Sequence, residues 1–341
     1  MRIEEQEVCE LMVRTLSGGD LRAALPMRDA IGAVEEGFKM MARGKAVVPQ
    51  RVPLNIEEYS GVMLYMPAYI KGKDALVIKE VSVYPENSRR GLPTIQGTVL
   101  LNDPRSGRLL AIMDGAVLTA IRTGAATGVA TRHLARVDVA AATIFGAGAQ
   151  ARTQLEALVE VRGIRKVKVY DVSLEAATRY SATMSRELGV DVTVARDSRE
   201  AISDADVVVT ATTSKTPVFK GEWLNEGTHI NGIGSHHPDA RELDTSTILR
   251  AKGKGKIVVD SREACLMEAG DIIIPIKEGV IAEGDIHAEI GEIVNGTKAG
   301  RTSNWEVTLF KSVGLAVQDA AAALAAYSTA LKKGIGRDVD I

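Results

Sequence analysis

The stretch from Val139 to Asp171 constrains the fold more than any other part of the chain. An apolar run ends at Phe145 and leads into Gly146-Ala-Gly-Ala-Gln-Ala151, an amphipathic segment follows, and a second run of β-branched residues ends at Asp171. A strand, a glycine turn that opens a helix and an acid after the next strand predict a dinucleotide-binding βαβ unit. The alternative is a plain strand-to-helix turn in an unrelated α/β protein.

The glycines and the acid predict separate roles. Gly146 permits a tight turn, Gly148 leaves room for a pyrophosphate, and the helix N-terminus offers N–H groups to phosphates. Asp171 favours NAD over NADP, because a carboxylate accepts hydrogen bonds from ribose hydroxyls and repels a 2′-phosphate. Val172 and Ser173 supply no arginine that would reverse this preference. The cofactor-binding residues expected here are Gly146, Ala147, Gly148, Ala149, Gln150 and Asp171.

Composition limits the possible partners. The chain has 341 residues, of which 45% are hydrophobic, and this length allows two domains with cores of their own. Because 42 Lys and Arg balance 44 Asp and Glu, no nucleic-acid partner is expected. Cys9 and Cys265 predict free thiols in a reducing compartment. The acidic segment Met1–Glu10 has no apolar core, and no run approaches the ~18 apolar residues of a membrane span. We therefore expect a cytoplasmic protein without a membrane partner.

The pattern predicts an α/β fold: a Rossmann-type doubly wound nucleotide domain and a separate α+β domain, for which the family resemblance given below implies substrate-binding and dimerisation roles. Residues 1–115 form the α+β domain, residues 116–304 the nucleotide domain, and a C-terminal helix within 305–341 completes the first domain. Turn signals between short β-branched runs predict antiparallel pairing in the first domain. Its expected elements are a helix at Met27–Arg43 and strands at Val47–Leu54, Gly61–Met66, Ala75–Tyr84, Thr94–Leu101 and Leu109–Met113.

A helix at Ala116–Ala135 leads into the nucleotide domain. Ligands of open α/β sheets lie at the carboxyl ends of the strands, which adds Ala211, Thr212, Ile233 and Gly234 to the expected cofactor contacts. The Ala-rich stretch Thr308–Leu331, with Leu309 and Phe310 on its apolar face, predicts a helix that crosses back to the first domain. Further strands are expected at Val190–Val194, Asp206–Thr210, His229–Ile233 and Lys256–Asp260.

Several motifs together resemble the ornithine cyclodeaminase and mu-crystallin family, which also contains archaeal-type alanine dehydrogenases and ketimine reductases. The resemblance covers nearly the whole chain. It rests on Met66-Pro-Ala, Lys79, Val81-Ser-Val-Tyr-Pro-Glu-Asn87, Gly91-Leu-Pro-Thr94, Leu118-Thr-Ala-Ile-Arg-Thr-Gly-Ala125, the glycine fingerprint, Asn231-Gly-Ile-Gly-Ser-His-His-Pro238 with Arg241-Glu-Leu-Asp244, and Phe310-Lys-Ser-Val-Gly314.

The resemblance implies roles for four residues of the first half of the chain. Arg51 and Arg122 match arginines that bind the α-carboxylate of a small amino or imino acid, for which a planar guanidinium is well shaped. Lys79 matches the active-site lysine, which can exchange a proton with an amine or imine. Thr123 lies in a turn that meets the cofactor. The alternatives are a solvent-facing Arg51, an Arg122 that ion-pairs between the domains, and a Lys79 that extends to solvent from a strand edge.

His236 occupies a position where family members that deaminate ornithine or alanine often have an aspartate. A histidine can also act as a general acid or base near neutral pH. The surrounding pattern is closer to mu-crystallin and the ketimine reductases. No metal is expected, because His236 and His237 are adjacent and no third ligand has zinc spacing.

The resemblance thus implies an NAD-dependent oxidoreductase that exchanges hydride with the α-carbon of a small α-imino or α-amino acid. Candidate reactions are reduction of Δ1-pyrroline-2-carboxylate or another ketimine, and an alanine dehydrogenase reaction. The alternatives are an ornithine cyclodeaminase, which uses NAD without net redox change, and a non-enzymatic small-molecule binder. A homodimer formed through the first domain is expected, because several short strands leave edges to pair.

Overall fold

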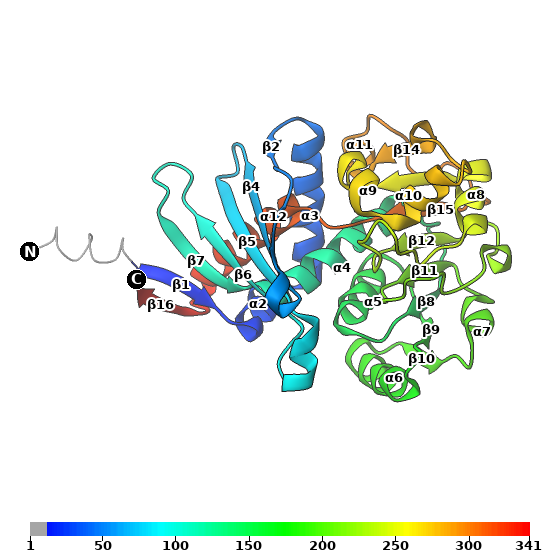
Figure 1. The fold of residues 1–341 in the computed structure, drawn as a ribbon, viewed down its shortest axis with the longest axis horizontal. Coiled ribbons are helices and arrows are strands. Elements are labelled where there is room, and N and C mark those ends of the chain that lie inside the picture. Colours follow the sequence, from blue (N-terminus) through cyan, green and yellow to red (C-terminus); the bar gives the residue numbers. More distant parts are fainter. Residues whose placement is uncertain (1–11) are drawn as a thin grey trace, which may run out of the picture. The chain divides into compact units, whose positions relative to one another are not determined.

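The computed structural model describes residues 12–341, so the Met1–Glu10 segment and Cys9 lie outside the described residues. Two compact units divide the chain (Figure 1). The first unit ends at Arg122 and resumes at Leu315, and the second runs from Thr123 to Gly314. The sequence predicts the two domain boundaries after residue 115 and after residue 304, whereas the units divide after Arg122 and after Gly314.

The first unit is a mostly antiparallel sheet with helices packed against it. Its strands run in the order β16-β1-β7-β6-β5-β4-β2, and β3 pairs with β4. Helix α12 contacts β4, β5 and β6, and α3 packs against α12. The elements are β1 (Met12–Leu16), α2 (Gly18–Ala24), α3 (Met27–Ala42), β2 (Ala46–Val47), β3 (Val52–Ile56), β4 (Gly61–Ile70), β5 (Ala75–Val83), β6 (Ile95–Asn102), β7 (Leu109–Asp114), α12 (Ala316–Lys333) and β16 (Arg337–Asp340). Helix α4 (Gly115–Leu134) spans the boundary at Arg122.

The predicted strand Val47–Leu54 is wrong as a single element. Only Ala46–Val47 and Val52–Ile56 are extended and paired, and residues 48–51 belong to neither strand. Pro49 accounts for the interruption, because proline has no N–H to donate to a sheet and a fixed φ.

The second unit is a parallel sheet in the order β10-β9-β8-β11-β12-β15-β13-β14. Apolar side chains form two separate core clusters, and together these account for most of the unit's buried hydrophobic residues. The elements are β8 (Ala141–Phe145), α5 (Ala149–Val161), β9 (Lys166–Tyr170), α6 (Leu174–Leu188), β10 (Asp191–Val194), α7 (Ser198–Ile202), β11 (Val207–Thr210), β12 (His229–Gly232), α8 (Thr245–Lys254), β13 (Lys256–Val259), α9 (Arg262–Glu268), α10 (Gly270–Lys277), β14 (Ile286–Glu289), α11 (Ile290–Val294) and β15 (Thr308–Lys311). The predicted Rossmann-type architecture is confirmed.

The prediction of one helix over Thr308–Leu331 is wrong. Thr308–Lys311 is strand β15, which pairs on both sides with β12 and β13, and the helix begins only at Ala316. The apolar residues Leu309 and Phe310 serve a buried central strand, in which both faces are covered. Gly314, with φ of +82°, separates strand from helix. The C-terminal part of the first unit therefore starts at Leu315.

Membrane-spanning helices and metal-binding clusters are both absent from the described residues. No helix in residues 12–341 combines the length and the apolarity that a membrane crossing requires. The same residues hold no group of three or more His, Cys, Asp and Glu side chains that could bind a metal ion. Cys265 is a buried free thiol.

Candidate functional site

Lys79 lies at the centre of the sheet of the first unit. In the register of the sheet it is directly opposite Met66 of β4 and Val99 of β6, so the three side chains share one face. All three are buried, and Lys79 is only 1% exposed. Its Nζ donates a hydrogen bond of 2.8 Å to Asp319 Oδ2, at the start of α12. Lys79 is therefore enclosed and paired.

Asp319 also binds Arg122, which ends the first segment of this unit. Arg122 Nε donates to Asp319 Oδ1 at 3.1 Å, and Arg122 Nη1 donates to Gln318 Oε1 at 2.6 Å. Asp319 has no exposed surface. Burial alone would raise the pKa of Asp319, but Lys79 and Arg122 hold it below its usual value. One ionised carboxylate thus connects the two cations.

The cluster lowers the pKa of Lys79 to about 8. Burial is the main cause, and the positive charges of Arg122 and Arg51 add to it, while Asp319 opposes the shift. Arg51 immediately precedes β3, and its charge acts on Lys79. Lys79 and Arg122 flank one carboxylate and Arg51 adds a third positive charge, an excess that suits an anionic ligand.

Sequence reasoning missed Gln318 and Asp319. Both fell inside a stretch interpreted as one long Ala-rich helix whose apolar face did not include them, although a charged residue among alanines was a usable signal. Gln318 is fully buried, and its Nε2 has no hydrogen-bond partner among the described residues. This amide nitrogen is available to donate to a bound ligand.

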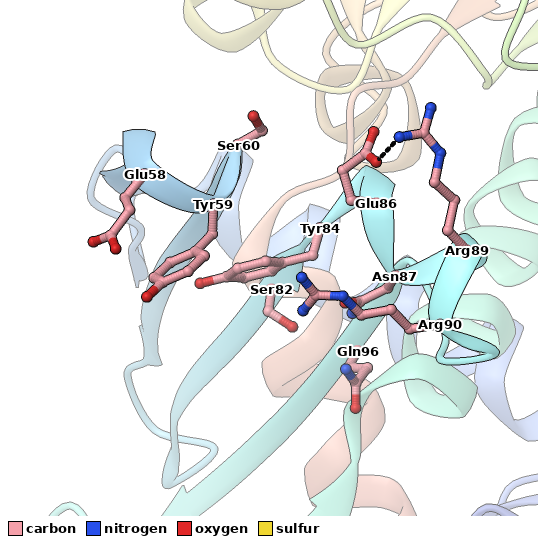
Figure 2. Close-up of a pocket in the computed structure, with 10 residues that line it drawn as sticks. All are labelled: Glu58, Tyr59, Ser60, Ser82, Tyr84, Glu86, Asn87, Arg89, Arg90 and Gln96. Carbon is pink, nitrogen blue, oxygen red and sulfur yellow. Dashed lines mark hydrogen bonds and ion pairs between the residues drawn. The ribbon is translucent and has the colours of Figure 1, made fainter.

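A hollow of about 580 Å³ in the first unit lies away from this cluster. Its lining includes Ser82, Tyr84, Arg90 and Gln96, which Figure 2 draws together with the Glu86–Arg89 ion pair. Ser82 of β5 and Gln96 of β6 are directly opposite one another in the register. Ser82 is three residues after Lys79 on β5, an odd number, so the two side chains point to different faces of the sheet. Since side chains alternate between the two faces, the hollow belongs to the face opposite Lys79.

In the second unit, the glycine fingerprint follows β8 and opens α5. Gly146 has φ of +96°, and a Cβ there would lie 2.5 Å from the carbonyl oxygen of Ala211. Gly148 caps the start of α5, and a Cβ there would meet no atom within 4 Å, so the space beside it is open. Gly146 is thus required for the turn, and Gly148 leaves access to the helix N-terminus.

A cavity of about 540 Å³ adjoins this turn. Asp171 lines it at the end of β9, where Oδ2 accepts from the backbone N of Ala147 and Oδ1 from that of Ser173, both at 2.8 Å. The predicted cofactor residues that line the cavity are Gly146, Ala147, Gly148, Asp171, Ala211 and Thr212. Open space at a helix N-terminus beside a carboxylate fits the pyrophosphate and ribose of a dinucleotide.

The other predicted cofactor residues do not line this cavity. Ala149 and Gln150 form the first turn of α5, and Thr123 is buried in α4. Ile233 and Gly234 follow β12 at the carboxyl edge of the sheet. The contacts of these five residues with a cofactor stay predictions.

His236 follows Gly234 on an exposed turn. Its Nδ1 donates to the carbonyl oxygen of Gly234 at 2.9 Å, since a carbonyl can only accept. Its ring centroid lies 4.8 Å from that of His237. His236 belongs to the second unit, whereas Lys79 and Arg122 belong to the first.

The chain is similar in sequence and in fold to known proteins. A model of the ornithine cyclodeaminase/mu-crystallin family matches residues 12–334. A Δ1-pyrroline-2-carboxylate reductase from Bacillus cereus is 40% identical over 325 residues, which cover 95% of this chain and 99% of the relative.

Two solved structures are also similar. The Thermococcus litoralis Δ1-pyrroline-2-carboxylate reductase in complex with NADH and L-proline has 50% identity and a TM-score of 0.91, covering 96% of this chain and 100% of the other. An archaeal alanine dehydrogenase dimer with bound NAD has 39% identity and a TM-score of 0.88, covering 96% and 99%.

These relatives confirm the predicted enzyme class, an NAD-dependent oxidoreductase, and NAD as its cofactor. They also confirm the predicted relationship. The chain belongs to the ornithine cyclodeaminase/mu-crystallin family.

Proposed function

We propose that the protein reduces Δ1-pyrroline-2-carboxylate to L-proline with NADH. The observation that carries this proposal is the buried lysine with a pKa of about 8, set beside two arginines and one carboxylate. Such a cluster can bind an anionic imino acid and exchange a proton with its nitrogen. The similarity to an enzyme solved with NADH and L-proline supports this choice of substrate.

The roles of the residues follow from their chemistry. Arg51 and Arg122 bind the substrate carboxylate, and Gln318 and Asp319 hold the Arg122 guanidinium in place. Lys79 protonates the imine nitrogen, which makes the adjacent carbon electrophilic. NADH, when bound, supplies the hydride to that carbon. A proton on nitrogen and a hydride on carbon together convert the C=N bond into the C–N bond of proline.

The assay that tests the proposal follows NADH oxidation by absorbance with Δ1-pyrroline-2-carboxylate, pyruvate with ammonia, and pyruvate with methylamine. Ornithine turnover is followed by proline formation with catalytic NAD⁺. We expect the highest kcat/KM with Δ1-pyrroline-2-carboxylate. A higher value with pyruvate and ammonia would favour the alanine dehydrogenase reaction instead, the second candidate suggested by the archaeal relative.

Asp171→Ala is expected to weaken NADH binding and to improve NADPH binding relative to NADH. In our proposal the carboxylate at the end of β9 accepts hydrogen bonds from the ribose, and their loss costs about 1–3 kcal/mol. KM values for both cofactors measure the effect in the parent and the variant. Equal use of NADH and NADPH by the parent protein would contradict the role of Asp171.

His236→Asp is expected to shift the ratio of activities toward ornithine. We propose that His236 assists proton transfer, and a histidine provides no negative charge for the second ammonium group of ornithine. The measurement is proline formed from ornithine with catalytic NAD⁺, compared with imino-acid reduction. An ornithine kcat/KM above that of every imino acid in the parent would identify the protein as a cyclodeaminase.

A homodimer formed through the first unit is also part of the proposal. Pro67, Ile78, Leu100 and Ile112 form a row across four strands, on the face that does not carry Lys79. All four are partly exposed, and such an apolar sheet face favours burial against a second copy. The archaeal alanine dehydrogenase relative is a dimer.

Light scattering at micromolar concentration is expected to give the mass of a dimer for the parent. Leu100→Glu should give a monomer, because it introduces a charge in the middle of the apolar row. Val137→Glu is the control, since Val137 is 87% exposed in the second unit and should leave the mass unchanged. A monomeric parent, or a dimeric Leu100→Glu variant, would exclude this interface.

A further inference from the structure

Glu242 lies in the loop between β12 and α8 and has no exposed surface. Its Oε1 accepts hydrogen bonds from the backbone N and the Oγ1 of Thr212, both at 2.7 Å. Its Oε2 accepts from Thr210 Oγ1 at 2.8 Å, from Gly234 N at 2.8 Å and from Ser235 N at 3.2 Å. Such a set of donors is matched only by a group that accepts through both oxygens, the ionised carboxylate.

The donors belong to two loops at the carboxyl edge of the parallel sheet. β11 ends at Thr210 and β12 ends at Gly232, and these strands are neighbours. Thr212 lines the 540 Å³ cavity, and the carbonyl of Gly234 accepts from His236 Nδ1. The carboxylate of Glu242 therefore links Thr212, which lines the cofactor cavity, to the segment that carries His236.

The backbone of Glu242 is held in turn by a buried ion pair, Asp271 with Lys311. Asp271 Oδ1 accepts from the backbone N atoms of Glu242 and Leu243 at 2.8 and 2.9 Å, and Asp271 Oδ2 is 2.9 Å from Lys311 Nζ. Burial raises the pKa of Glu242, and the charge of Lys311 opposes this. Gly234 completes the packing, because a Cβ there would lie 2.6 Å from Glu242 Oε1.

We infer that Glu242 is a positioning residue that holds the loops after β11 and β12 in the arrangement that binds NADH. The inference concerns NADH binding, and it rests on the proposed function only in assuming that the bound NADH reduces an imino acid. NADH binding can be measured without any substrate, so the inference and the proposed function can fail separately.

Glu242→Gln separates this role from general stabilisation. The glutamine side chain has the same shape, but its NH₂ group must face N–H donors of either Thr212 or Gly234 and Ser235, whichever way the amide is turned. One of the two loops therefore loses its attachment.

Glu306→Gln is the matched control. Glu306 is buried, accepts from the N and Oγ1 of Thr302 at 2.9 and 2.7 Å, and pairs with Lys256. It precedes β15, and Lys256 begins β13, so this second buried carboxylate lies at the amino edge of the same sheet.

The experiment titrates NADH by fluorescence and measures Tm for the full chain and both variants. We expect both variants to lower Tm, Glu242→Gln to raise the Kd for NADH at least about tenfold, and Glu306→Gln to leave it within about twofold. The KM for NADH should rise with Kd, with a smaller change in kcat. An unchanged Kd in Glu242→Gln, or an equal rise in both variants, would overturn the inference.

A second variant covers the case in which Glu242→Gln does not fold. Thr210→Val removes one donor to Glu242 Oε2 and leaves every cavity-lining residue in place. A rise in Kd of about threefold is expected, and an unchanged Kd would count against the inference. A parent that binds NADH but reduces no imino acid would refute the proposed function and leave this inference standing.

Discussion

Lys79→Ala is expected to lower the rate of hydride transfer at least about 100-fold while NADH binds with unchanged affinity. The lysine is the proposed proton donor to the imine nitrogen, and alanine leaves no donor at that position of β5. Single-turnover kinetics measure the transfer step, and NADH fluorescence titration measures binding. Since the proposal has Lys79 act on the substrate and not on the dinucleotide, loss of the ammonium group should not change cofactor affinity.

Lys73→Ala is the control for this experiment. Lys73 belongs to the same unit, but it is exposed and pairs only at 3.4 Å with Glu36, so its loss should leave the rate within about twofold. A Lys79→Ala variant that keeps more than about a tenth of the parent rate would be too active for the proposed role. Equal loss in both lysine variants would indicate a general effect of charge.

The pH dependence of the parent provides a second check on Lys79. Only the protonated lysine can donate, and its pKa is lowered to about 8, mainly by burial. The rate of imine reduction should therefore be constant well below pH 8 and should fall as the pH rises through this value. An exposed lysine, with a pKa near 10.5, would keep the rate constant to a much higher pH.

The residues that sequence analysis could find are those whose signal is local. Gly146, Gly148 and Asp171 lie within one βαβ unit, and the structure gathers them around one cavity. The family resemblance identified Lys79, which is also the single cation in an apolar run that one strand contains. For the glycines and Asp171, a few neighbouring residues were enough for the prediction.

The residues that escaped are those defined by distant contacts. Asp319 is separated from Lys79 by 240 positions and from Arg122 by 197, so no window of sequence contains the triad. The Ala-rich composition after Thr308 also hid the change from strand to helix at Gly314, because buried parallel strands and buried helices are both continuously apolar. Glu242 escaped for the same reason, since its function depends on two loops that only the sheet brings together.

Asp319→Asn is expected to destabilise the folded protein by about 3–5 kcal/mol near neutral pH. The asparagine has a similar shape but no charge, and it leaves Lys79 and Arg122 buried without a compensating carboxylate. Removal of one partner from a buried ion pair typically has this cost, because the remaining charge stays desolvated. Urea unfolding followed by circular dichroism measures the free energy of unfolding.

Adding Lys79→Met to Asp319→Asn should recover part of the lost stability. Methionine fills similar space without a charge, so the double variant buries one cation fewer. If Asp319 contributed only shape and hydrogen bonds, the double variant would be less stable than Asp319→Asn alone. The double-mutant cycle therefore separates charge compensation from packing.

The stability of Asp319→Asn should also rise with pH, and the sign follows from proton binding. Asp319 raises the pKa of Lys79, so its removal moves that pKa further below the value of about 8. Between the lowered pKa in the folded state and about 10.5 in the unfolded state, the unfolded chain binds more protons, so unfolding becomes less favourable as the pH increases. The falling limb of the pH–rate profile should move to lower pH in the same variant. A variant with parent stability and an unshifted profile would show that Asp319 does not control the charge of Lys79.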